Sequence, residues 1–128
     1  MDNRSILTAF NNHFLEFVKD IQLVFPDDTD IATVYNAFTK MRKANPKLIM
    51  IAFKEHVYDN YYKEIDLGNL DFFINKDYDN DMKNVGNGGI ILEKINYLKK
   101  PIKEMNKDDQ DKVIKYMQNL CKLCNLYN

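Results

Sequence analysis

The sequence predicts an all-α fold, an irregular bundle of about five helices plus one short helical segment, in one domain over residues 1–128. Three observations support this prediction. Apolar residues recur at steps of three and four, which is the period of a helix with one buried face. Prolines and glycines fall between these stretches, where helices end. The length of 128 residues and the hydrophobic content of 45% suit one compact core.

The first predicted helix runs from about Ser5 to Phe25, and Pro26 ends it because the residue before a proline is pushed out of helical geometry. The polar run 27–30 then offers N-cap oxygens and first-turn acids for a second helix, which ends near Pro46. The apolar stripes of the two helices are Ile6, Phe10, Phe14, Phe17, Val18, Ile21 and Phe25, and then Ile31, Val34, Tyr35, Phe38 and Met41.

A third helix is predicted from Pro46, placed in its first turn, to about Ile65, with Gly68 as its C-terminal stop. Its first half is apolar nearly all round, which indicates a central position. The short apolar segment 70–74 is predicted to be one or two helical turns, with a strand as the alternative.

The acidic and glycine-rich stretch 75–89 is predicted to be a long loop, because it has no apolar period. A helix follows over about 91–102, kinked or broken at Pro101. The last helix starts around Lys107, with acids in its first turn. Its apolar face consists of Val113, Ile114, Met117, Leu120, Cys121, Leu123 and Cys124.

Composition and charge narrow the classes of function. The net charge is −1, whereas proteins that wrap duplex DNA usually carry a basic excess. The longest apolar run, 48–53, is far shorter than the roughly 20 residues of a membrane-spanning helix. The N-terminus lacks the apolar block of a signal peptide. We therefore expect an unprocessed intracellular protein without a membrane association.

The pair Cys121 and Cys124 has the C-x-x-C spacing of zinc and redox sites. A zinc site needs four ligands, however, and the only histidines are His13 and His56, each alone in the sequence. In a C-terminal helix, this spacing places both sulfurs on the buried stripe, so core packing is predicted. Both histidines are expected to be partly buried structural residues. With no nucleophile motif, no enzyme, cofactor or metal is predicted.

The acidic loop places Asp77, Asp79 and Asp81 at positions one, three and five of an EF-hand pattern. Met82 then replaces the required glycine, and Gly88 stands where a glutamate should complete the shell. A solvated loop is the favoured interpretation, with weak calcium binding as the alternative. The following cluster, 86–89, is predicted to be a flexible hinge rather than a phosphate loop.

The aromatic and acidic stretch between residues 58 and 81 is the predicted partner-binding surface. Tyrosine is enriched at protein interfaces because its ring buries area at a low entropy cost, although the same rings could cover the core. The candidate residues are Tyr58, Tyr61, Tyr62, Phe72, Phe73, Tyr78, Asp77, Asp79 and Asp81. The sequence therefore favours a non-enzymatic protein-interaction or structural module, whose partner and oligomeric state it does not specify.

A lysine-rich stretch supplies the alternative function, a nucleic-acid-associated accessory factor. Its candidate contacts are Lys94, Lys99, Lys100, Lys103 and Lys107. Glu93 and Glu104 interrupt this run, so it also suits the solvated side of an amphipathic helix.

The stretches 25–38 and 43–49, with the shorter pieces 71–78 and 112–116, resemble small helical proteins encoded by large DNA viruses of eukaryotes. The resemblance covers most of the chain and contains no active-site motif. It implies a virus-encoded protein of the host cytoplasm or the virion, and it carries over no activity and no site residues.

Overall fold

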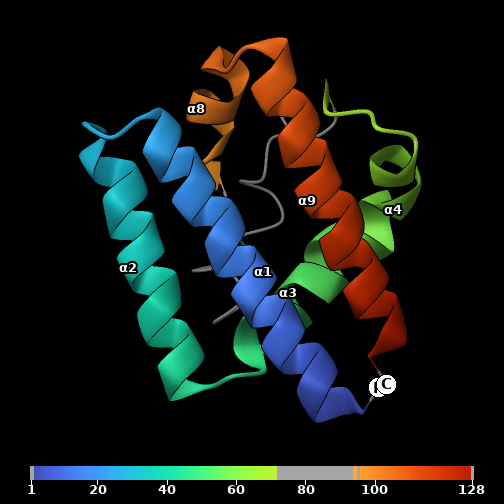
Figure 1. Cartoon of the computed structure of the whole chain (residues 1–128). Helices are drawn as coiled ribbons and strands as arrows, with labels where there is room; N and C mark the ends of the chain where they lie inside the picture. Colours follow the sequence, from blue (N-terminus) through green and yellow to red (C-terminus); the bar gives the residue numbers. More distant parts are fainter. Residues whose placement is uncertain (1, 72–93, 95, 128) are drawn as a thin grey trace.

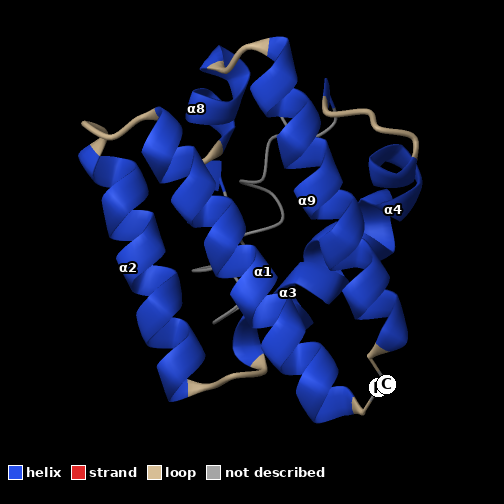
Figure 2. Cartoon of the chain, viewed as in Figure 1, coloured by secondary structure: helices blue, strands red, loops and turns tan. Residues whose placement is uncertain are grey.

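The computed structural model describes residues 2–71, 94 and 96–127, and this part of the chain is helical, with no strand. The elements are α1 (Asn3–Val24), α2 (Thr29–Ala44), α3 (Leu48–Phe53), the π-helix η1 (Lys54–Tyr58), α4 (Asp59–Asp66), α8 (Lys99–Glu104) and α9 (Lys107–Leu126). Figures 1 and 2 show them as an irregular bundle. The predicted all-α fold is therefore confirmed.

Helices α1 and α2 lie side by side and are joined by a short connection (Figure 1). Asp2 caps α1, since its carboxylate accepts a hydrogen bond from the Ser5 N–H at 2.8 Å. Asp28 caps α2 in the same way, accepting from the N–H groups of Asp30 and Ile31. Such caps satisfy backbone donors that have no partner within the helix. The two predicted helices are confirmed, with Pro26 in the connection between them.

The third helical stretch is continuous over α3, η1 and α4, but it differs from the prediction at its start and in its middle. Pro46 lies outside the helix rather than in its first turn, because α3 starts at Leu48 and its N-cap residue is Lys47. In the middle, η1 has the wider π geometry, which insertion of one residue into a helix produces and which hydrophobic periodicity does not reveal.

Gly68 ends this stretch as predicted, with a φ of +77°, a left-handed conformation that glycine adopts without steric cost.

The C-terminal part corrects the prediction for Pro101. This residue is buried within the first turn of α8, where a proline is tolerated, and the chain instead turns just before it, at Tyr97 and Leu98. Helix α9 begins where expected, and Asn106 caps it by accepting a hydrogen bond from the Asp109 N–H at 2.8 Å. The predictions for residues 72–93 lie outside the described residues, as does the prediction for Ile95.

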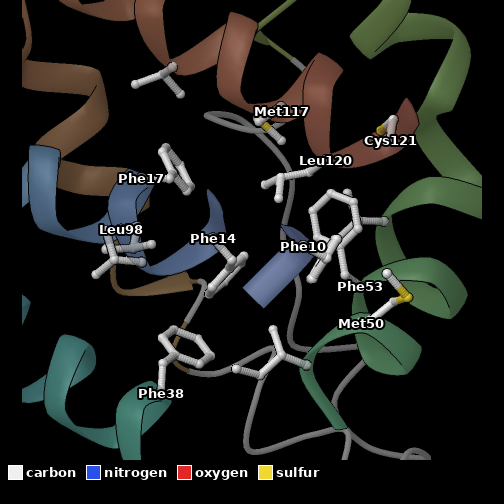
Figure 3. Close-up of a cluster of buried hydrophobic side chains, with 14 of the residues drawn as sticks. Phe10, Phe14, Phe17, Phe38, Met50, Phe53, Leu98, Met117, Leu120 and Cys121 are labelled. Carbon is white, nitrogen blue, oxygen red and sulfur yellow. The ribbon is translucent and has the colours of Figure 1, made fainter. Parts of the chain in front are cut away.

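The core forms around α1, which lies between α2 and α9 and also contacts α3. Phenylalanines from three helices meet there (Figure 3): the ring centroid of Phe14 lies 4.8 Å from that of Phe38, and Phe10 lies 5.5 Å from Phe53. Cys121 and Cys124 are free thiols buried in the same core, so their predicted packing role is confirmed. Within the described residues, no helix is long and apolar enough to cross a membrane.

Candidate functional site

The predicted tyrosine cluster is divided between the core and the surface. Tyr58 lies on η1, while Tyr61 and Tyr62 lie on α4. Tyr58 and Tyr61 are half-buried and pack against the core, whereas the Tyr62 side chain is 45% exposed. Only Tyr62 of the three is therefore a predominantly surface ring. The other predicted residues, Phe72, Phe73, Tyr78, Asp77, Asp79 and Asp81, lie outside the described residues.

Tyr58 and Tyr62 form a stacked pair, with their ring centroids 5.5 Å apart and their planes inclined by 30°. Their separation of four residues places them on one side of the helical stretch. The Tyr58 hydroxyl donates a hydrogen bond to Oδ1 of Asn125 at 3.1 Å, which ties η1 to the end of α9. Burial raises the pKa of Tyr58 above its ordinary value, so this hydroxyl stays protonated at neutral pH.

The stacked pair borders a cavity of about 260 Å³ between α4 and α9. Gln118 of α9 connects the two walls, because its Nε2 donates a hydrogen bond to the Ile65 carbonyl at 3.0 Å. We call Tyr58, Tyr62 and this cavity the aromatic face. Other residues that line the cavity are Ile65, Asp66, Cys121, Lys122 and Asn125.

The thiol at the cavity wall is not suited to nucleophilic chemistry. Burial raises the pKa of Cys121 to about 12, and burial together with the neighbouring Cys121 raises the pKa of Cys124 to about 12. The reactive form of cysteine is the thiolate, which is scarce at neutral pH for such values. These two thiols therefore supply no nucleophile to the aromatic face at neutral pH.

The helical stretch that carries the aromatic face is acidic. Residues 54–71 contain five acids against two lysines, a formal charge of −3 with His56 neutral. The acids are Glu55, Asp59, Glu64, Asp66 and Asp71, and the lysines are Lys54 and Lys63. Two lysines also reach the aromatic face: Lys122 lines the cavity, and the Nζ of Lys63 lies 6.0 Å from the Tyr62 ring centroid.

The lysines predicted to contact nucleic acid lie near the N-terminal end of α9, whereas the aromatic face borders its C-terminal end. Lys100, Lys103 and Lys107 are exposed on α8 and at the start of α9, and Lys99 is half-buried. Lys94 places its Nζ 5.5 Å from the ring centroid of Tyr97. Acids surround this group: Lys107 pairs with Asp111 at 4.0 Å, and Asp108 and Asp109 occupy the first turn of α9. The lysines thus share their surface with carboxylates.

The two histidines contact different groups. The His13 ring lies 4.8 Å from that of Tyr116, whose hydroxyl donates hydrogen bonds to the carboxylates of Asp20 and Glu16. His56 lies 3.9 Å from a Glu55 oxygen. Both are partly buried, as predicted. Within the described residues, no three His, Cys, Asp or Glu side chains gather closely enough to hold a metal ion.

Sequence reasoning missed one feature, a basic groove where α1 and α2 meet the connection to α3. Its volume is about 830 Å³, and Arg4, Arg42, Lys43 and Lys47 line it. Arg4 and Arg42 are the only arginines of the chain, and that scarcity was the signal that could have drawn attention to them. Arg4 and Arg42 are 38 residues apart in the sequence, so only the tertiary fold brings them together.

Comparison with protein families, with curated proteins and with solved structures found no match for this chain.

Proposed function

We propose that this protein is a non-enzymatic interaction module that binds a protein partner through its aromatic face. The single observation that carries this proposal is the stacked pair Tyr58 and Tyr62 beside a cavity, with 45% of the Tyr62 side chain exposed. A ring held by stacking loses little conformational freedom when a partner covers it, so its buried area contributes efficiently to affinity.

The contacts of Tyr58 support the same assignment. Its hydroxyl already has an acceptor in Asn125, so it does not need water or a partner to satisfy it. A π-helical segment, η1, ends at this residue, and such segments are frequent at functional sites of helices. The pair is therefore a preorganised surface, which lowers the cost of binding.

The partner that fits this face is a protein segment with an apolar or aromatic anchor flanked by lysine or arginine. The anchor would enter the cavity of about 260 Å³, and the basic residues would face the acids of residues 54–71, whose formal charge is −3. Charge complementarity of this kind increases the association rate and disfavours acidic competitors.

The test is a comparison of two tyrosines with similar exposure. Leu67 is 83% exposed, so a photo-crosslinking amino acid at this position can capture candidate partner proteins from the cells that express this protein. Each candidate is then purified and titrated against the wild type, Tyr62→Ala and Tyr97→Ala, since Tyr97 is 48% exposed. The proposal requires that only Tyr62→Ala weakens binding, by about tenfold or more.

Because the chain resembles small helical proteins of large DNA viruses, we propose infected host cells as the place to seek the partner. Nucleic-acid binding through Lys94, Lys99, Lys100, Lys103 and Lys107 stays a prediction. The acids Asp108, Asp109 and Asp111 beside these lysines weaken it, because they repel phosphates. A mobility-shift assay at low salt tests it separately.

A further inference from the structure

The basic groove shares no lining residue with the cavity of the aromatic face, and it has the charge of an anion-binding site. Four cationic side chains line it: Arg4 from α1, Arg42 and Lys43 from α2, and Lys47 from the connection to α3. No acid is among the described residues that line it. Within residues 2–71, 94 and 96–127, none of these four cations forms an ion pair. Their charge is therefore not neutralised there by a neighbouring carboxylate.

The arginines distinguish this groove from an ordinary lysine-rich surface. The chain has 18 basic residues, and its only two arginines both line this one groove. The planar guanidinium group forms paired hydrogen bonds to phosphate or carboxylate oxygens, whereas lysine acts as a point charge. Arg42 is half-buried and Arg4 is exposed, so one is held by its surroundings and the other can move toward a ligand.

The groove also has an apolar part. Leu7 and Leu15 of α1 line it, and Leu7 is only 9% exposed. The volume of about 830 Å³ falls in the range of sites that hold small molecules. A simple inorganic anion would leave this apolar surface uncovered. The groove therefore suits a ligand that has an apolar or aromatic part next to its charged group.

Asn11 fixes the wall of the groove between α1 and the connection to α3. It lines the groove, its side chain is 1% exposed, and its Nδ2 donates a hydrogen bond to the Pro46 carbonyl at 2.9 Å. That bond fixes the orientation of the amide, because a carbonyl only accepts. Oδ1 is then left buried without a donor in the described part of the chain. This atom is shielded from solvent, so it lies behind the surface of the groove and a molecule in the groove does not reach it.

We propose that the basic groove binds a small phosphate-bearing molecule with an aromatic part, the chemistry of a nucleotide. Arg4 and Arg42 pair with the phosphate oxygens, and Lys43 and Lys47 neutralise the remaining negative charge. Leu7 and Leu15 contact the aromatic ring. Binding, without a chemical step, is the whole of this proposal.

The test is calorimetric titration of the full chain with ADP at low salt and with EDTA present. The decisive variant is Arg4→Gln with Arg42→Gln, and its matched control is Lys112→Gln with Lys115→Gln, which removes the same charge from exposed positions of α9. We expect the wild type to bind ADP, the arginine variant to bind at least about tenfold more weakly, and the control to stay within about twofold. Absence of binding to the wild type, or equal losses in both variants, would overturn the proposal. Circular dichroism verifies that each variant is folded.

Two further probes define the ligand class. ADP should bind at least about threefold more tightly than inorganic pyrophosphate, because only ADP covers the apolar surface. Equal affinities would refute the aromatic part of the proposal. An oligoglutamate peptide that bound more tightly than ADP would overturn it in favour of an acidic protein segment. Tyr62→Ala should leave ADP binding unchanged, so the outcome is independent of the aromatic face.

Discussion

The side-chain amide of Asn11, in the third turn of α1, donates a hydrogen bond to the backbone carbonyl of Pro46 at 2.9 Å. These residues are 35 positions apart. Asn11 is a buried polar residue in an otherwise apolar part of α1, and Pro46 lies in the connection between α2 and α3. The bond therefore fixes where the third helical stretch starts relative to α1. Both residues also line the basic groove.

Asn11→Ala tests how much this hydrogen bond contributes to the stability of the fold. It removes the hydrogen bond and leaves a small void, so we expect the free energy of unfolding to fall by about 1–3 kcal/mol. Urea denaturation followed by circular dichroism measures the change. Asn12→Ala, at the exposed neighbouring position, is the control and should stay within about 0.5 kcal/mol. Equal effects of the two substitutions would show that the Asn11–Pro46 bond contributes little.

Phe14→Ala tests the phenylalanine cluster. Phe14 is 1% exposed and contacts Phe38 and Phe17, with ring centroids at 4.8 and 6.3 Å. Its truncation should lower the free energy of unfolding by about 3–5 kcal/mol, from lost burial and from the cavity that is left. Leu23→Ala, at a position 66% exposed, should change it by less than about 0.5 kcal/mol. A loss below about 1 kcal/mol for Phe14→Ala would contradict the core described here.

The two buried thiols predict a loss of stability at alkaline pH. Their pKa values are about 12 in the folded chain, against 9.0 ordinarily, so the unfolded chain releases these protons first. Above about pH 9 the folded state therefore binds more protons than the unfolded state, and stability falls as pH rises toward 12. Between pH 8 and about 10.5 we expect a decrease of about 4 kcal/mol from the two thiols together, about 2 kcal/mol from each.

The variant Cys121→Val with Cys124→Val should have a shallower dependence of stability on pH over the same interval. Urea denaturation at several pH values compares it with the wild type. Tyr116 adds a decrease in the same direction in both proteins, because burial and its bonds to acids raise its pKa. Equal slopes for the two proteins would show that the thiols do not titrate as described.

Tyr58→Phe separates the ring of Tyr58 from its hydroxyl. The substitution removes the hydrogen bond to Asn125 and keeps the stacking on Tyr62. We expect the free energy of unfolding to fall by only about 0.5–1 kcal/mol, because the bond is near the surface. Partner affinity, measured by titration, should stay within about twofold. A large loss of affinity would mean that the hydroxyl contacts the partner directly.

Much of the fold could be predicted from the sequence because its signals are local. The apolar spacing in α1 and α2, the caps at their starts and the glycine at position 68 each act within a few residues. Two predictions about proline were wrong for a related reason. Pro46 and Pro101 each suit more than one position near a helix start, and tertiary packing selects among them.

The site could be predicted only in part because its geometry is not local. Clustering along the chain pointed to the tyrosines, but it did not separate the surface ring of Tyr62 from the partly buried rings of Tyr58 and Tyr61. The π-helix that ends at Tyr58 has no sequence pattern of its own. The basic groove needs Arg4 and Arg42 together, and only the packing of α1 on α2 brings them to one cavity.

The central claim, that the aromatic face is a protein interface, is tested most directly by the affinity of one purified partner for three forms of the full chain. The forms are the wild type, Tyr62→Ala and Tyr97→Ala, the two tyrosines being 45% and 48% exposed. The account predicts that Tyr62→Ala weakens binding by about tenfold or more while Tyr97→Ala stays within about twofold. Equal affinities for all three forms, or a larger loss for Tyr97→Ala, would contradict it.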